Sequence, residues 1–147
     1  MSEIASHIEN LEEPFVVLSV GIPGSGKTTV LTELAEHLGI ERVCPDEIRK
    51  QFTGDVSDQS QNQEVWAEAH RRVETAVALG QSAIVDATHT HARGRAETTE
   101  MYRAFGALNV VAVVFDIEAE EAKMRNSLRE NPVPEEVIDR MASALTK

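Results

Sequence analysis

The sequence predicts an α/β sandwich built on a central, mainly parallel sheet of four to five strands. Short apolar runs alternate with longer segments whose apolar residues recur at helical spacing. No internal repeat or low-complexity tract interrupts this alternation. The 147 residues, 41% of them hydrophobic, suffice for one domain with a real core. We therefore expect a single domain over residues 1–147, with residues 1–13 as an N-terminal extension.

The first half of the chain is predicted to hold one strong strand and one regular helix. Residues 15–20 are almost wholly apolar and rich in β-branched side chains, which is typical of a buried strand. Apolar residues then recur at helical spacing over residues 27–38, and Gly39 provides a stop for that helix. We expect a short strand at residues 41–44 and a helical turn that begins at Asp46.

The second half of the chain continues the alternation. Residues 56–61 are polar and predict an exposed loop. Two further strong strands are expected at residues 82–85 and 109–115, because both runs are apolar and β-branched. Helices are expected at about 65–80, 93–105 and 118–129, and Pro134 is suited to open a last one.

Composition argues against several classes of function. The formal net charge is −11, from 25 acidic against 14 basic residues, so the surface repels long polyanions and anionic membranes. A non-specific nucleic-acid coat and a membrane-surface binder are therefore disfavoured. The single cysteine, Cys44, permits neither an internal disulfide nor a thiolate metal cluster. The acidic N-terminus does not resemble a signal peptide and no apolar run reaches transmembrane length, so we expect a soluble, cytoplasmic protein without a membrane partner.

The segment from Gly21 to Thr28 carries the strongest functional signal. It matches the phosphate-binding pattern G-x-x-x-x-G-K-[ST] in full, and it lies between a predicted strand and a predicted helix. Its glycines let backbone N–H groups turn inward around phosphate oxygens, and the helix N-terminus adds partial positive charge. We expect Lys27 to neutralise the β- and γ-phosphates and the Thr28 hydroxyl to hold Mg²⁺. A glycine turn that carries Lys-Thr by chance is the alternative, which the full match disfavours.

A phosphate loop alone does not distinguish a kinase from a nucleotide-dependent switch. The Asn-Lys-x-Asp motif with which GTPases bind their base is missing from the sequence. Motor and remodelling ATPases need a longer chain than 147 residues. The small size therefore favours a kinase that transfers phosphate to a bound acceptor.

Charged side chains follow the predicted strands, at the sheet edge where ligands of such folds bind. Asp46 and Arg49 lie one helical turn apart on one face, which suits a general base beside an anion clamp. Taken alone, Asp46 is equally suited to cap the N-terminus of its helix. Asp86 ends a strand, as a magnesium-binding acid does, and its alternative is a side chain that caps the following turn.

Arg125 and Arg129 lie at i, i+4 in a charged segment. On their own they are best explained as part of a solvated face, because Glu121 and Arg125 form a well-oriented ion pair. The functional alternative is a lid helix whose guanidinium groups close over the transferring phosphate. His89 and His91 lack a third ligand nearby and indicate a polar loop rather than a zinc site.

Five motifs follow one another along the chain. They are Gly-x-Pro-Gly-Ser-Gly-Lys-Thr, Pro-Asp46-x-Ile-Arg49, Val-Asp86-Ala-Thr88, Arg125-Asn126-x-x-Arg129 and Val133-Pro134-x-x-Val137-Ile-x-x-Met141. In this order they resemble the polynucleotide 5′-hydroxyl kinase family of P-loop phosphotransferases, from about residue 15 to residue 141. The resemblance implies a P-loop kinase-like three-layer sandwich with a helical lid, which we place at residues 118–134. His89 stands where the family pattern usually has Asn, and the Asp-x-Asp-x-Thr signature of an accompanying 3′-phosphatase domain is missing.

The resemblance also implies a role for each motif residue. Asp46 would act as general base on a 5′-hydroxyl, and Arg49 would clamp a 3′-phosphate of the acceptor. Lys27, Asp46 and Arg129 are the expected catalytic residues. The expected donor site comprises Gly21, Gly24, Ser25, Gly26, Lys27, Thr28, Thr29, Arg125 and Arg129; the acceptor site comprises Asp46, Arg49, Asp86 and Thr88; and the metal site comprises Thr28 and Asp86.

The sequence thus predicts a stand-alone kinase that uses ATP and Mg²⁺ or Mn²⁺. It would phosphorylate 5′-hydroxyl ends of DNA or RNA, contacted over few nucleotides, as in end healing and repair. A kinase for a small-molecule hydroxyl is the first alternative, and Arg49 would be dispensable if that acceptor carried no phosphate. A nucleotide-binding switch or assembly protein with slow hydrolysis is an alternative of another class, which ATP turnover without a labelled product would support.

Overall fold

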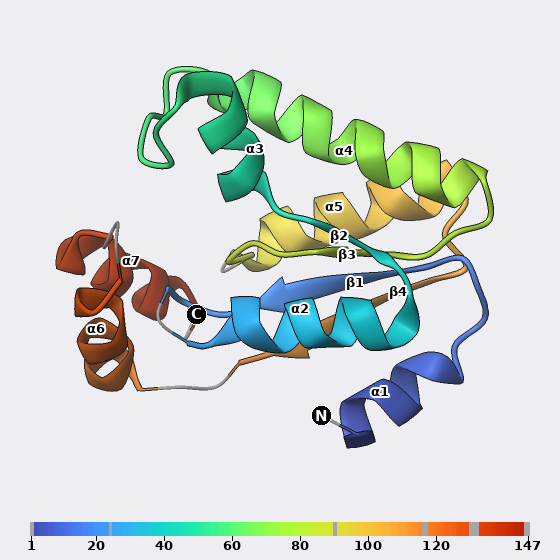
Figure 1. The fold of residues 1–147 in the computed structure, drawn as a ribbon, viewed down its shortest axis with the longest axis horizontal. Helices are drawn as coiled ribbons and strands as arrows, with labels where there is room; N and C mark the ends of the chain where they lie inside the picture. The colour runs from blue at the N-terminus through green and yellow to red at the C-terminus, as the bar shows by residue number, and fades with distance from the viewer. Residues whose placement is uncertain (1, 24, 90, 116–117, 130–132, 146–147) are drawn as a thin grey trace.

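Four strands lie between two layers of helices (Figure 1). The computed structural model describes residues 2–23, 25–89, 91–115, 118–129 and 133–145. Within them the sheet has the order β2-β3-β1-β4, and every pairing is parallel. This confirms the predicted class and the lower of the two expected strand numbers. The strands are β1 (Phe15–Val20), β2 (Glu41–Val43), β3 (Ala83–Val85) and β4 (Asn109–Val114), and the helices are α1 (Ser2–Glu9), α2 (Lys27–Leu38), α3 (Pro45–Thr53), α4 (Asn62–Ala78), α5 (Ala92–Phe105), α6 (Ala119–Ser127) and α7 (Glu135–Leu145).

Strand β1 occupies the interior of the sheet because it is apolar on both faces. All six of its residues are buried, and Val17 is in register with Ile84 of β3 and Val111 of β4. Parallel strands end at the same edge of a sheet, so the segments after β1, β2 and β3 gather there. That edge carries the predicted site residues that follow these strands.

Alternate strand residues pack against a different helical layer on each face of the sheet. Val16 and Leu18 belong to the core under α3, α4 and α5, where Tyr102 is the largest fully buried side chain. Phe15 and Val17 belong to the core under α1 and α2. Figure 1 shows the two layers on opposite sides of the strands.

Helix α1 was not expected within the N-terminal extension. It packs through Ala5 and Ile8, both buried, in the core that α2 shares. Eight residues are too few for a helix that is stable in isolation, so tertiary burial rather than propensity accounts for α1. Ile4, Ala5 and Ile8 do recur at helical spacing, so the sequence carried a signal for α1 that the prediction did not use.

Helices α6 and α7 form a separate pair at the carboxyl edge of the strands (Figure 1). They share a small core in which Ile22, Ala122 and Ile138 are buried. Helix α7 starts one residue after Pro134, as expected, whereas α6 ends two residues before Arg129. Part of the expected lid, residues 130–132, lies outside the described residues. No helix in the described part of the chain is long and apolar enough to cross a bilayer.

Candidate active site

The glycine-rich segment after β1 is closely packed at its start. The N–H of Gly21 donates to the carbonyl of Thr88 at 3.0 Å, which ties this segment to the one that follows β3. A Cβ atom on Gly21 would lie 2.9 Å from the Oγ of Ser25 and 3.0 Å from the Cβ of Phe115, so the packing requires glycine.

The same segment ends at the N-terminus of α2. Gly26 precedes the helix with a left-handed φ of 85°, which a larger side chain rarely adopts. The Oγ of Ser25 is buried and has no hydrogen-bond partner among the described residues. A buried donor without a partner is costly, and an anionic ligand would relieve that cost. The predicted site residue Gly24 lies outside the described residues.

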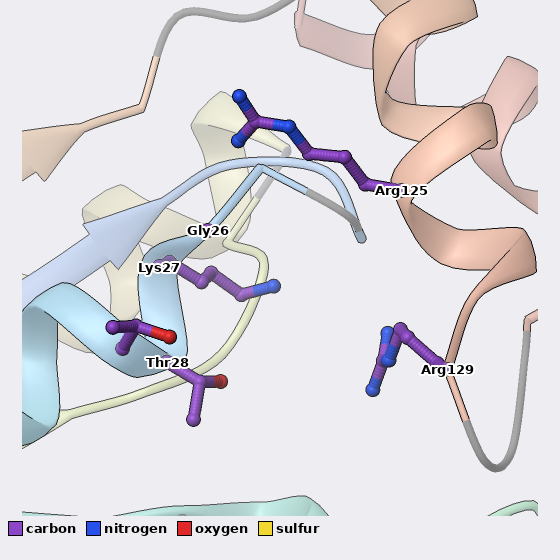
Figure 2. Close-up of a pocket in the computed structure, with 6 residues that line it drawn as sticks. Gly26, Lys27, Thr28, Arg125 and Arg129 are labelled. Atoms are coloured by element: carbon purple, nitrogen blue, oxygen red, sulfur yellow. The ribbon is translucent and has the colours of Figure 1, made fainter.

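A cavity of about 230 Å³ opens at this helix N-terminus (Figure 2). Lys27 reaches into it from α2, and Arg129 points toward the same space from the segment after α6. The structure therefore brings together cationic groups that are about 100 positions apart in the sequence. The lining residues are Gly26, Lys27, Thr28, Thr29, Arg125 and Arg129, six of the nine residues expected at the donor site.

The Lys27 amine is a cation in a poorly solvated position. Burial lowers the pKa of Lys27, and Arg129 lowers it further, while the carboxylates of Asp86 and Asp46 oppose the shift. These four groups are thus within electrostatic reach of one another. A phosphate entering the cavity would supply the negative charge that stabilises the protonated amine.

Arg125 forms the predicted ion pair and also lines the cavity, so the structure leaves both of its predicted alternatives open. Its Nη2 donates to the Oε1 of Glu121 at 2.9 Å, as expected of the i, i+4 pair. The same side chain lines the cavity, and a Cβ on Gly26 would lie 3.4 Å from its Nη1. The pair is half-exposed and contributes little stability, so a ligand phosphate exchanges with Glu121 at small cost.

Asn126 ties the end of α6 to the segment before α7. It is 2% exposed, donates from Nδ2 to the carbonyl of Val133 at 2.7 Å, and accepts from the N–H of Val133 at 3.0 Å. Asn126 belongs to one of the five motifs, but the motif alone assigns it no role. Its contact with Val133, seven positions away, does not follow the i, i+3 or i, i+4 spacing that would reveal it in the sequence.

Asp46 and Arg49 contact each other on α3, as their spacing predicts. The Nη1 of Arg49 donates to the Oδ1 of Asp46 at 2.7 Å, and its Nη2 donates to the Oδ1 of Asn62 at 2.5 Å. The Arg49 side chain is 7% exposed and that of Asp46 is 65% exposed. The buried Nε of Arg49 has no partner among the described residues. A buried guanidinium thus orients an accessible carboxylate.

The capping alternative for Asp46 is wrong. Helix α3 begins at Pro45, so Cys44 is the N-cap residue and makes no side-chain cap bond. Proline at the first helical position lacks the N–H that a cap would satisfy, which explains the earlier start. Burial raises the pKa of Cys44 to about 11, so this thiol is no nucleophile near neutral pH.

Asp86 lies at the end of β3 and is paired in an unexpected way. Its side chain is 2% exposed, and its Oδ2 accepts from the Nε of Arg42 at 3.1 Å. The Nη1 of Arg42 also donates to the Oε2 of Glu47 at 2.9 Å. The turn-capping alternative is thus replaced by an ion pair that the sequence did not indicate. Arg42 and Asn62 act through contacts 44 and 13 positions away, so neither formed a recognisable motif.

The donor set is compatible with a magnesium ion. Thr28 and Asp86 offer hard oxygen atoms, and Mg²⁺ in nucleotide sites uses one or two such groups together with phosphates and water. No cluster of three His, Cys, Asp or Glu that could hold a metal by itself occurs among the described residues. A magnesium ion would therefore be held jointly with a nucleotide.

His89 follows Thr88 at the same edge of the sheet. Its backbone has a left-handed φ of 46°, and its Nδ1 lies 2.8 Å from the carbonyl oxygen of Ser19. A carbonyl only accepts, so Nδ1 carries the proton. Burial lowers the pKa of His89, which keeps the ring neutral. His89 thus holds the end of β3 against β1, and the described residues provide no zinc cluster around it.

Comparisons with known proteins agree with this fold. Residues 16–147 match the family described as AAA domain. A chain in a structure of the Pnkp1/Rnl/Hen1 RNA repair complex has a TM-score of 0.82 at 22% identity, and the match covers 93% of this chain and 45% of that chain. A gluconokinase from Sinorhizobium meliloti 1021 has a TM-score of 0.59 at 17% identity, covering 90% and 75%. The chain thus spans less than half the length of the repair-complex protein. A search of curated proteins finds no match.

Proposed function

Since the chain belongs to the AAA domain family and has a P-loop kinase fold, we propose that it transfers the γ-phosphate of ATP to the 5′-hydroxyl end of DNA or RNA. The observation that carries this proposal is the contact between Asp46 and Arg49. An accessible carboxylate lies beside a buried guanidinium that still has a free N–H. A base and an anion clamp at this spacing suit an acceptor that carries both a hydroxyl and a phosphate.

The reaction assigns a role to each group. The Asp46 carboxylate accepts the proton of the 5′-hydroxyl as that oxygen forms a bond to the γ-phosphorus. The bond from that phosphorus to the β,γ-bridging oxygen breaks, and ADP leaves with the electron pair. Lys27 and Arg129, which face the same cavity, offset charge on the transferring group. Thr28 and Asp86 would hold Mg²⁺, which neutralises phosphate charge when bound.

Arg49 would position the acceptor in this reaction. Its Nη1 and Nη2 are bonded to Asp46 and Asn62, and its Nε is buried without a partner, so an acceptor phosphate would reach Nε through a local shift or exchange with Asn62. The orientation of the guanidinium is fixed before the acceptor arrives, so little entropy is lost on binding. The acceptor is thus expected to be a nucleotide with a 3′-phosphate rather than a nucleoside.

A kinase for a small hydroxylated metabolite is the second candidate. The likeness to a gluconokinase favours it, at a lower TM-score than the likeness to the repair complex. A small polyol would leave the unpartnered Nε of Arg49 unsatisfied. We therefore rank the polynucleotide acceptor first.

Label transfer from γ-labelled ATP distinguishes the candidates. The assay offers 5′-hydroxyl DNA and RNA oligonucleotides, the same oligonucleotides with a 5′-phosphate as controls, and gluconate as a small acceptor. We expect label on the 5′-hydroxyl oligonucleotides alone. Label only on gluconate would support the metabolite kinase. ATP hydrolysis with no labelled acceptor would support a nucleotide-dependent switch.

A further inference from the structure

A second cavity lies beside β2, between α3 and α4. Its volume is about 500 Å³, within the usual range for ligand pockets and larger than the donor cavity. Neither the phosphate loop nor the lid contributes to it. Its lining residues are Arg42, Cys44, Glu47, Lys50, Gln51 and Arg72.

The charge of this cavity is opposite to that of the whole chain. Its lining holds three cations, Arg42, Lys50 and Arg72, against one carboxylate, Glu47. The chain carries 25 acidic and 14 basic residues, so cations are the minority elsewhere. A cationic cavity in an acidic surface concentrates anions locally.

Two of the three cations retain capacity for a ligand. Lys50 is exposed and makes no ion pair among the described residues. Arg72 donates from Nε to Glu68, but its Nη2 reaches only Gln51, at 3.4 Å, which is a weak contact. A phosphate group would gain charge-assisted hydrogen bonds from both.

The cavity adjoins the acceptor side of the proposed site. Lys50 lies one turn after Asp46 on α3 and directly follows Arg49, so the three side chains share adjacent strips of one helix. A strand that offers its 5′-hydroxyl to Asp46 and its first phosphate to Arg49 would pass Lys50 next. Lys50, which lines the cavity, is thus the α3 residue that connects the face of the expected base to the cavity face.

Arg42 connects this cavity to the donor site. It lines the cavity and at the same time donates to Asp86 at 3.1 Å and to Glu47 at 2.9 Å. An anion in the cavity would compete with both carboxylates for this guanidinium. Binding there is thus coupled to how freely Asp86 accepts a metal.

We propose that this cavity binds a phosphate-bearing anion through Lys50, Arg72 and Arg42. Its source, which rests on the proposed function, is a phosphate of the acceptor strand downstream of the one at Arg49. A free phosphorylated small molecule has the same chemistry. The two sources differ in whether the phosphate is covalently joined to the acceptor.

Direct binding tests the cavity without any reaction. Calorimetric titration with pyrophosphate uses a Lys27→Ala background, in which the phosphate loop is disabled. We expect Lys50→Ala with Arg72→Ala to weaken binding at least tenfold. The control, Arg93→Ala with Arg103→Ala on exposed α5 positions, removes the same charge elsewhere and should change affinity less than twofold. Lys50→Glu alone reverses charge on an exposed side chain without repacking and should also weaken binding. Equal affinity in all variants would overturn the proposal.

Acceptor length identifies the source. In the Lys27-containing protein, a hexanucleotide is expected to have a kcat/KM at least tenfold above that of a nucleoside 3′-phosphate. Lys50→Ala with Arg72→Ala should abolish this gain and leave the short acceptor unaffected. Inorganic phosphate can also be added to the assay with the nucleoside 3′-phosphate. If it raises the kcat/KM of that short acceptor to the value of the hexanucleotide, the cavity binds a free anion instead. If no nucleotide is labelled, the proposed function fails, whereas the pyrophosphate titration still decides the cavity.

Discussion

The cations around the donor cavity differ from those around the acceptor side in how they are paired. Among the described residues, Lys27 and Arg129 make no ion pair. On the acceptor side, Arg49 is bonded to Asp46 and Asn62, and Arg42 to Asp86 and Glu47. Both regions are cationic, but Arg49 and Arg42 are paired with carboxylates, whereas Lys27 and Arg129 form no ion pair among the described residues.

This difference indicates two modes of substrate binding. On the donor side burial lowers the pKa of Lys27, so on the proposed function an incoming polyphosphate would stabilise the charged amine. On the acceptor side both terminal nitrogens of Arg49 already have partners and only Nε lacks one, so a ligand there competes with internal partners. We therefore expect donor-side substitutions to affect the chemical step most, and acceptor-side substitutions to affect selectivity and coupling.

The largest effect is expected from Lys27→Ala. The methyl group cannot offset charge on the transferring phosphate, so kcat should fall about 10³-fold. Because burial disfavours the charged amine in the folded state, its removal should leave the thermal unfolding midpoint unchanged or raise it. Label-transfer kinetics and thermal unfolding measure the two quantities. A near-normal kcat would contradict the donor site.

Asp46→Asn should have the next largest effect. The amide keeps the size of the side chain but cannot accept the hydroxyl proton, so kcat should fall about 10²-fold. Binding of ATP should be unchanged. Glu64→Gln removes an exposed carboxylate of α4 that makes no ion pair among the described residues, and it serves as the matched control. Equal losses in the two variants would show that bulk charge, not a base, is responsible.

Arg49→Lys should mainly change use of the acceptor. A single ammonium cannot hold Asp46 and Asn62 and still donate to a phosphate, so KM for the oligonucleotide should rise about tenfold. The KM for ATP should change little. Asn62→Ala removes only the outer support of the guanidinium and should give a smaller increase. If only the KM for ATP rises, Arg49 contacts the donor rather than the acceptor, which would contradict the prediction.

Arg42→Met should have the smallest effect on transfer and a measurable effect on stability. It leaves the buried Asp86 carboxylate without its partner, which destabilises a protein by about 3–5 kcal/mol. Mg²⁺ should recover part of that loss, because Asp86 is then free to bind it. Thermal unfolding in the presence of ADP, with and without Mg²⁺, should show a larger rise of the midpoint for the variant than for the unchanged protein. Equal rises of the unfolding midpoint in the two proteins would show that Asp86 does not bind the metal.

The fold followed from local pattern where that pattern was complete. Residues 15–20 and 27–38 were predicted with their observed bounds, because burial on both faces and helical spacing leave distinct signatures. Helix α1 was missed although its apolar residues recur at helical spacing, and its stability comes from Ala5 and Ile8 packing on a distant part of the chain. Residues 109–115 were also predicted as a strand, and β4 ends one residue earlier.

In the candidate site, too, contiguous motifs were predictable from the sequence and contacts between distant segments were not. The phosphate loop and the Asp46–Arg49 pair are contiguous motifs, so the sequence revealed them. The ion pair of Arg42 with Asp86 joins two strands 44 positions apart, and nothing in either local segment specifies it. Contacts of that kind depend on strand order, which residue spacing does not determine.

The carboxamide of Asn126 takes the place of one peptide group, because it both donates to and accepts from Val133. Asparagine is also the side chain that ageing proteins convert to aspartate by loss of ammonia. That conversion would present an acceptor to a carbonyl that needs a donor, within one turn of both lid arginines. The link between α6 and Val133 therefore depends on Asn126 remaining an amide, which its burial favours.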